Sequence, residues 1–355
     1  MGIRVTSSAD LGSTYASVAA EPIVSLGGPD ADGPELFYQI TNVYQDARDQ
    51  LWVADWQSGE LRIFSADGSH LRTEGGRGEG PGEFLGIRLL GGFAGDRVGA
   101  WDQPSGRLSA YDLVGALVTT DRLPASDEAL PRPFAIYPDG SVLGQVPEVR
   151  MAATLAEGEI IRAGVRLVRF DLGAGTRVDV ATAEGPSWIW TGRSQIPVPF
   201  TANAGFALSG DEVHIVAGPS FRVTVFEDGR LSRIYGVERE ERAVTRDAVD
   251  DYRDFIEEFY PAEQHAALLS ALGHPTTPSV MPAYTGVVVS SSGEVWAARY
   301  SPRTLWDVFG PEGELRGQVE MPPDFYPMSV RGRRLAGVWR DDVGVEYVRV
   351  YEMGS

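Results

Sequence analysis

The feature that most constrains the fold is an internal repeat. The segment 49–64 (DQLWVADWQSGELRIF) aligns with the segment 96–111 (DRVGAWDQPSGRLSAY) at an offset of 47 residues. The same offset relates two glycine-rich loops, 29–37 (PDADGPELF) and 76–84 (GRGEGPGEF). A period of roughly 20–50 residues is typical of repeat architectures, in which each copy is one supersecondary unit. We therefore expect the chain to fold as a series of similar units.

Weaker copies of the repeat continue down the chain. Each combines short apolar strands with Asp-Gly, Ser-Gly or Glu-Gly turns, as in SADGS (65–69), EDGR (227–230) and PEGE (311–314). Strands of about five residues, joined by such turns and repeated every 40–50 residues, are typical of the four-stranded blades of a β-propeller. We predict an all-β, six-bladed β-propeller. Six residues mark the second strands: Leu51, Val98, Val142, Val213, Val295 and Leu335.

The two ends of the chain are predicted to meet. The last unit shows only three strands, around 327–331, 334–340 and 345–352. The N-terminal segment 21–28 (EPIVSLGG) lies 47 residues before the fourth strand of the first full unit. Because an incomplete blade leaves edge hydrogen-bonding groups exposed, we predict that this segment closes the last blade as its outer strand. Residues 1–355 would then form a single propeller domain.

Two insertions interrupt the period. The segment 145–166 lies between the second and third strands of the third unit and is predicted to form a long hairpin. The segment 238–283 lies between the fourth and fifth units and is predicted to be helical, with Thr245 as the first cap. Propeller topology places both insertions on one end of the blades, so the helices are either a solvated surface pair or a lid. The apolar positions at helical spacing are Val249, Tyr252, Phe255 or Ile256, and Phe259.

Composition excludes several classes of protein. The chain has no Cys, and all 31 of its basic residues are Arg, so thiol nucleophiles, zinc–thiolate sites, Schiff-base chemistry and the Walker-A lysine are excluded. A net charge of −19 disfavours binding to nucleic acid. The sequence contains no run of 18 apolar residues and therefore predicts no membrane span. Residues 1–20 show no signal peptide pattern.

The GEGPGEF loop (78–84) and the strand LWVAD (51–55) of the preceding unit resemble the NHL-type repeat. The six-unit plan is similar to the six-bladed β-propeller superfamily, and the likeness covers nearly the whole chain. That superfamily includes gluconolactonase-like and paraoxonase-like hydrolases, strictosidine-synthase-like enzymes and bacterial envelope proteins. The resemblance implies a periplasmic, envelope-attached or extracellular location. Fold likeness alone does not choose among these activities.

The two asparagines of the chain, Asn42 and Asn203, are candidate metal ligands. Both fall near the start of an inner strand, three units apart, which places them across the predicted axis. In the hydrolases that the plan resembles, Glu, Asn and Asp side chains at similar positions hold a central Ca²⁺, a cation that prefers oxygen ligands. The equivalent positions in the other units are poor ligands: Leu89, Pro133, Gly286 and Tyr326.

Aromatic and arginine side chains are concentrated in the segments predicted on the loop end. Such side chains offer flat apolar surfaces for sugar rings or peptide side chains and planar recognition of carboxylates. An alternative for Trp188, Trp190 and Arg193 is packing within the loop GPSWIWTGRSQIPVPF, and Trp52 and Trp296 are predicted to pack between blades. The binding-face candidates are Asp55, Trp56, Trp101, Asp102, Trp188, Trp190, Arg193, Arg222, Arg299, Tyr300, Trp339 and Arg340.

Three functions follow from these patterns. The first is a non-enzymatic, monomeric propeller that binds a protein, peptide or carbohydrate through its loop end and axial funnel. The second is a Ca²⁺-dependent hydrolase or lactonase, in which the metal polarises an ester carbonyl. The third is a lyase or cyclase that uses Asp55, Asp102 or Glu148 as a general acid or base.

Overall fold

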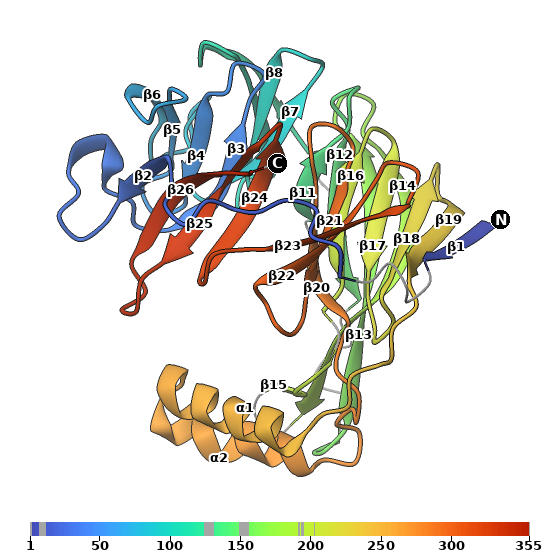
Figure 1. The fold of residues 1–355 in the computed structure, drawn as a ribbon. Helices are drawn as coiled ribbons and strands as arrows, with labels where there is room; N and C mark the ends of the chain where they lie inside the picture. The colour runs from blue at the N-terminus through green and yellow to red at the C-terminus, as the bar shows by residue number, and fades with distance from the viewer. Residues whose placement is uncertain are drawn as a thin grey trace.

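The structure is a computed structural model that describes residues 2–6, 12–123, 131–148, 156–190, 192, 195–201 and 203–354. Within these residues the strands form six sheets, four of four strands and two of five (Figure 1). Sequential strands pair antiparallel in every sheet. The prediction of an all-β fold built from four-stranded antiparallel sheets is therefore confirmed.

The first three sheets contain strands that follow one another in the chain. The first sheet consists of β3 (Ile40–Gln45), β4 (Leu51–Asp55), β5 (Glu60–Phe64) and β6 (His70–Gly75). The second consists of β7 (Ile87–Phe93), β8 (Arg97–Asp102), β9 (Arg107–Asp112) and β10 (Leu117–Arg122). The third consists of β11 (Arg132–Ile136), β12 (Val142–Glu148), β13 (Ile160–Asp171), β14 (Thr176–Trp190) and β15 (Gln195–Pro197).

Two of the remaining sheets also contain strands from the N-terminal segment. The fourth sheet consists of β16 (Gly205–Ser209), β17 (Glu212–Val216), β18 (Arg222–Glu227), β19 (Arg230–Val237) and β1 (Gly2–Thr6). The fifth consists of β20 (Tyr284–Val289), β21 (Val295–Arg299), β22 (Leu305–Phe309) and β23 (Leu315–Glu320). The sixth consists of β24 (Phe325–Arg331), β25 (Arg334–Arg340), β26 (Glu346–Glu352) and β2 (Val24–Gly27).

The first strands of the six sheets are neighbours in chain order. β3 contacts β7, β7 contacts β11, and the series continues through β16, β20 and β24, which in turn contacts β3. Residues from all six of these strands line one cavity of about 330 Å³, which we call the axial cavity. Its lining is largely apolar, with residues such as Phe134, Ile136, Phe206, Val287 and Met328.

The N-terminal segment runs along the outer strands of three sheets. β2 pairs antiparallel with β26, so that Val24 and Leu26 are buried in the core of the sixth sheet. Upstream, Thr14 bridges to Gln318 of β23, and β1 pairs parallel with β19 (Figure 1). The sequence pattern did not indicate β1, because a fifth, parallel edge strand lies outside the repeat.

Large aromatic side chains fill the space between neighbouring sheets. Trp52 and Trp296 are fully buried, which confirms their predicted packing role. Trp101 was expected on the loop end, and this prediction is wrong, because only 1% of its surface is exposed and it packs with Phe93 and Ile136 between the second and third sheets. The second strand of a sheet, such as β8, is covered by a neighbouring sheet on each of its two faces. Side chains that point to either face of β8 are therefore buried.

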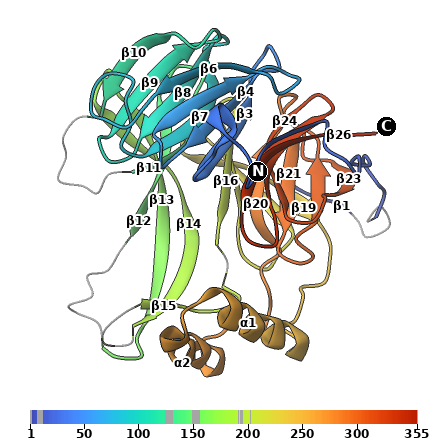
Figure 2. The ribbon, with the colours of Figure 1, turned by 90° about the vertical axis from the view of Figure 1, so that its left-hand side faces the viewer.

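The two insertions pack against each other. β13 and β14 extend into a long hairpin, and the helices α1 (Arg246–Phe259) and α2 (Ala262–Ser270) lie beside its far end (Figure 2). Ile256 and Leu268 of the helices are buried against Ile189 of β14. Thr245 caps α1 as predicted, since its side chain accepts a hydrogen bond from the backbone N–H of Ala248. None of the helices in the described ranges has the length and apolar character needed to cross a membrane.

The prediction of a loop at 185–200 needs a correction. The segment 185–190 was interpreted as part of a loop, but it continues β14, and 195–197 form β15. The hairpin predicted for 145–166 is present in its described part, because 145–148 of β12 pair antiparallel with 164–167 of β13. The longer ladder is the one that joins β13 to β14, the third and fourth strands of the sheet. In the extension of the sheet, Ile189 of β14 pairs with Ile196 of β15, and both are buried against the helices.

A buried histidine in the fourth sheet is expected to make stability depend on pH. His214 is 2% exposed, and its Nδ1 lies 3.1 Å from the hydroxyl of Tyr235. Burial, with the nearby charge of Arg233, lowers the pKa of His214 to about 4. Unfolded histidine has a pKa of about 6.5, so below that pH the unfolded state binds more protons and the free energy of unfolding falls as the pH drops towards 4.

We expect the variant His214→Leu to lack this loss of stability at low pH. Between pH 7 and pH 4.5, urea unfolding of the wild type should lose roughly 2–3 kcal/mol more than unfolding of the variant, as the linkage relation gives. The lost contact with Tyr235 lowers the stability of the variant equally at both pH values, because burial keeps the pKa of Tyr235 far above this range. Equal pH dependence in the two proteins would contradict the prediction.

Candidate functional site

The longest connections lie together on one end of the sheets, which we call the loop face. It contains the connections between second and third strands and those that lead from one sheet to the next. At the base of the helical insertion, Ala243 bridges to Val280, and backbone hydrogen bonds join Val244 to Ser279 and Met281 to Arg242. This short ladder anchors both ends of the insertion beside the β13–β14 hairpin (Figure 2).

A cavity of about 680 Å³ opens between this hairpin and the base of the insertion, and we call it the hairpin cavity. Four segments contribute to it: the hairpin, the chain before β16, the connection between β17 and β18, and the chain after α2. The lining residues are Ile160, Arg162, Gly164, Ala183, Glu184, Gly185, Ser187, Phe200, Thr201, Gly218, Pro219, Thr276, Pro278, Ser279, Val280 and Pro282.

A β-bulge shapes the hairpin at the cavity. Arg162 pairs with Ser187 and Gly164 pairs with Glu184, so two residues of β14, at 185 and 186, oppose a single residue of β13. Such a bulge bends the strand and increases its twist. The result is that Arg162, Glu184 and Ser187 all line the same cavity.

The charged groups of the cavity are opposite in sign and lie among apolar side chains. Arg162 and Glu184 are both exposed, and in the described part of the chain neither side chain has a hydrogen-bond or ion-pair partner. Ile160, Phe200 and Val280 supply the apolar surface. This combination suits a small ligand that has an apolar body and polar or charged ends.

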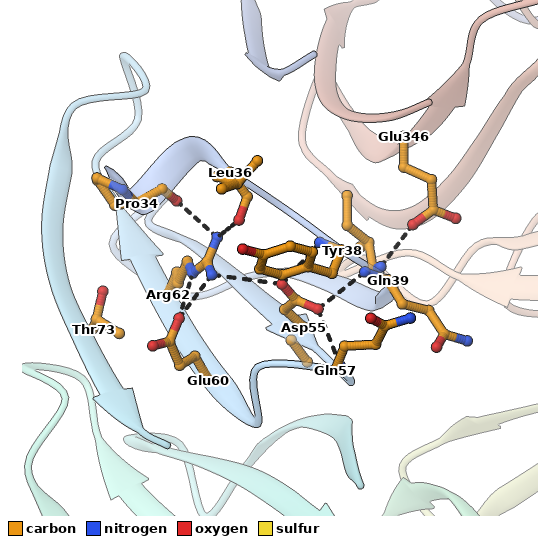
Figure 3. Close-up of polar contacts among 12 residues, drawn as sticks. Pro34, Leu36, Tyr38, Gln39, Asp55, Gln57, Glu60, Arg62, Thr73 and Glu346 are labelled. Carbon is orange, nitrogen blue, oxygen red and sulfur yellow. Dashed lines mark hydrogen bonds and ion pairs between the residues drawn. The ribbon is translucent and has the colours of Figure 1, made fainter. Parts of the chain in front are cut away.

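The structure gives two predicted face residues, Asp55 and Asp102, a structural role instead. Asp55 is fully buried and accepts backbone hydrogen bonds from Tyr38 and Gln39, each at 3.0 Å (Figure 3). Its carboxylate also lies 3.5 Å from Arg62. Because these partners occupy the carboxylate and exclude solvent, the geometry supports a structural role for Asp55, and its contact with a ligand or action as an acid or base stays a prediction.

Asp102 repeats this arrangement in the second sheet. It is fully buried and accepts hydrogen bonds from the backbone N–H groups of Leu85 and Gly86, at 3.0 and 2.9 Å. Its carboxylate also lies 3.7 Å from Arg107. The aspartates of the sequence repeat therefore hold the incoming connections to the first and second sheets. For Asp102 too the geometry supports a structural role, and ligand binding or catalysis stays a prediction.

In the fifth sheet the charges at these positions are exchanged. Arg299 is the last residue of β21, the second strand, as Asp55 is of β4 in the first sheet. Asp307 of β22 occupies the position in the strand pairing that Arg62 occupies in β5. Asp307 is fully buried, and both Arg299 and Arg239 form paired contacts with its carboxylate, at 2.6–3.3 Å.

Two cations therefore share one buried carboxylate. Tyr284 also donates a hydrogen bond to Asp307, at 2.9 Å. Burial would raise the pKa of Asp307, but the hydrogen bonds and charges of Arg299 and Arg239 hold it below its ordinary value. Arg299 was predicted as a binding residue, and the structure instead places its guanidinium in this internal cluster.

The other predicted binding residues are spread over the loop face. Trp188 and Trp190 are half-buried on β14, and neither lines the hairpin cavity. Trp339 stacks with Arg349 at 3.5 Å, and Arg340 pairs with Glu346 at 2.7 Å. Of the remaining candidates, Trp56 and Tyr300 are half-buried, Arg222 is exposed at the start of β18, and Arg193 lies outside the described residues.

None of the predicted binding residues that the structure describes lines the hairpin cavity, whereas Arg162 and Glu184 do. Sequence reasoning missed both. Arg162 belongs to the insertion 145–166, and Glu184 begins the Glu-Gly-Pro sequence at the bulge. Neither feature predicts a cavity until the pairing of β13 with β14 is known.

The structure separates the two candidate metal ligands. Asn42 lines the axial cavity, and Asn203 is exposed, two residues before β16. The remaining side chains that line the axial cavity are apolar apart from the hydroxyl of Tyr44, which does not fit the six to eight oxygen ligands of Ca²⁺. In the described ranges no group of three His, Asp or Glu residues is arranged to hold a metal ion. This donor set does not fit calcium.

Comparison with known proteins gives information on the fold but not on the activity. No protein-family model and no curated protein matches the sequence. A solved structure of a DUF4221 family member from Bacteroides vulgatus matches with a TM-score of 0.51 at 9% identity, covering 96% of this chain and 99% of that one. An exported protein, by its description, from Bacteroides fragilis matches at 0.49 and 11% identity, with 98% coverage of both chains.

A gluconolactonase from Xanthomonas campestris matches with a TM-score of 0.46 at 13% identity, covering 89% of this chain and 86% of that one. The chain shares its general fold with the DUF4221 structure, and its antiparallel sheets are consistent with a β-propeller-like architecture. Identities this low concern the fold alone. The function must therefore be argued from the site itself.

Proposed function

We propose that the six sheets are the blades of a single closed β-propeller formed by residues 1–355, with the helices of 238–283 inserted into it. Three observations support this proposal. The first strands contact one another in sequence, with β24 against β3; all six line the axial cavity; and β2 supplies the fourth strand of the last sheet. The NHL-type resemblance and the secreted or envelope location remain predictions.

We further propose that this propeller binds a small amphipathic ligand in the hairpin cavity. The observation that carries the proposal is the cavity itself, whose volume of about 680 Å³ falls within the range of roughly 300–1,000 Å³ found for ligand sites. Arg162 and Glu184 offer two charged groups for polar ends, and Ile160, Phe200 and Val280 offer an apolar surface. Peptide and carbohydrate ligands with apolar faces both satisfy this chemistry. The binding role is favoured over catalysis because two of the three acids nominated for catalysis, Asp55 and Asp102, are buried and hydrogen-bonded within the fold. The side chain of the third, Glu148, lies outside the described part of the chain.

The fluorescent probe 1-anilinonaphthalene-8-sulfonate tests this proposal, because it combines an aromatic body with an anionic group that suits Arg162. We expect one saturable site. Ser187→Trp should abolish it by filling the cavity, and Arg162→Gln should weaken it about tenfold, as loss of a charge-assisted contact predicts. Thr182→Trp is the matched control, since Thr182 is exposed on the same strand and does not line the cavity. Equal probe binding by both tryptophan variants would contradict the proposal.

A further inference from the structure

Two arginines hold equivalent positions on neighbouring first strands. Arg88 of β7 pairs with Trp101, three residues after the second-strand marker Val98. Arg132 of β11 pairs with Gln145, also three residues after the corresponding marker, Val142. β7 and β11 contact each other, and both arginines lie near the loop-face ends of their strands.

These arginines differ from most of the arginines around them. Arg62, Arg107, Arg169 and Arg233 each pair with a carboxylate. For the guanidinium groups of Arg88 and Arg132, the described part of the chain provides neither an ion-pair partner nor a hydrogen-bond acceptor, although the chain carries 50 acidic residues. Neighbouring cations that lack a counter-charge among the described residues of so acidic a protein are candidates for binding an anion from outside.

The geometry around Arg88 holds its charge in place. Its guanidinium lies over the ring of Trp56, 5.7 Å from the centroid. That ring in turn fits closely against Gly86, where an added Cβ would lie 2.6 Å from the indole. Partial burial, together with the positive charge of Arg132, lowers the pKa of Arg88, so the two cations are close enough to disfavour each other.

A bound anion would remove this repulsion. Arginine presents a planar fork of N–H donors that matches the oxygens of carboxylates and phosphates. The strands that carry the arginines continue directly into the axial cavity, which Gly91 and Phe134 help to line. A ligand held by its anionic group at the arginines could therefore place an apolar part against Trp56 or towards this cavity.

We propose that Arg88 and Arg132, with the ring of Trp56, form an oxyanion-binding site at the loop-face end of the axial cavity, for the carboxylate or phosphate group of a small molecule. This site is separate from the hairpin cavity, because the two share no residue. Loss of one would leave the other intact.

Titration with benzoate and with inorganic phosphate, at constant ionic strength, tests the proposal. The readout is the indole N–H signal of Trp56 in ¹H–¹⁵N spectra, assigned with Trp56→Phe. We expect a saturable shift in the wild-type protein and about tenfold weaker binding in Arg88→Gln and in Arg132→Gln. The matched control is Arg230→Gln, an exposed arginine on β19, which should bind as the wild type does.

The possible outcomes separate the alternatives. Saturation by benzoate but not phosphate assigns a carboxylate ligand, and the reverse assigns a phosphate ligand. The absence of a saturable shift with either anion, or equal affinity in the wild type and both arginine variants, overturns the proposal. Both arginines are exposed, so their variants should retain the fold, which circular dichroism checks. Ser187→Trp should leave benzoate binding unchanged, which distinguishes failure of this site from failure of the hairpin cavity.

Discussion

A variant that lacks residues 1–28 is expected to aggregate and to lose its cooperative unfolding transition. The deletion removes β2, whose Val24 and Leu26 are 5% and 4% exposed. Burial of each such aliphatic side chain stabilises a fold by roughly 1.5–3 kcal/mol. The deletion also removes Tyr15, which packs edge-on against Trp296 and donates a hydrogen bond to Glu294. The backbone of β26 would then become an open edge, a ready template for intermolecular pairing.

The matched control for this deletion lacks only residues 1–11. It removes β1 and keeps the contacts of Thr14, Tyr15, Val18 and β2. Because β1 is a fifth strand added to a sheet that already has four, the control should elute as the full chain does and melt within a few degrees of it. Size-exclusion chromatography and thermal unfolding make the comparison. A monomeric variant without residues 1–28 that melts at the wild-type temperature would contradict the role assigned to β2.

Asp307→Asn is expected to cost about 3–5 kcal/mol of stability, the usual loss when one partner of a buried ion pair is removed. Asparagine retains the size of the side chain but leaves Arg239 and Arg299, each 12% exposed, without a counter-charge. The two cations would then repel each other beside the ring of Phe221. The urea midpoint should fall accordingly.

Two comparisons make this second prediction specific. Asp250→Asn breaks an exposed pair with Arg253 on α1 and should change stability by less than about 1 kcal/mol. Adding Arg239→Gln to Asp307→Asn should recover part of the loss, because one of the two unpaired cations is removed. If Asp307→Asn and Asp250→Asn unfold at the same urea concentration, the charge of Asp307 does not hold the cluster together.

Local patterns predicted much of the fold. The offset of 47 residues located the strands of the first two sheets, because each blade needs the same alternation of short apolar strands and tight turns. Thr245 marked the start of α1 correctly, since a cap depends only on residues within one turn. Trp52 and Trp296 were identified as core residues from their matching positions.

The candidate site could not be predicted in the same way. Asp55 and Asp102 looked like functional acids because they recur near the loop face, yet recurrence reflected their shared structural contact with the backbone of the incoming connection. The hairpin cavity depends on a bulge, on the packing of α1 and α2, and on segments more than 100 residues apart in the sequence. No short-range pattern encodes those contacts.

The amino-acid sequence by itself determined the repeating strands, their turns and the acidic, lysine-free surface, because each of these depends on neighbouring residues or on composition. Only the tertiary structure decided which charges are engaged inside the protein and which have no counter-charge among the described residues. Asp55, Asp102 and Arg299 find partners within the fold, whereas Arg88, Arg132 and Arg162 find none among the described residues. The reason is physical: a side chain's charge is neutralised by whatever lies within a few ångströms of it, and in this chain those neighbours come from distant segments.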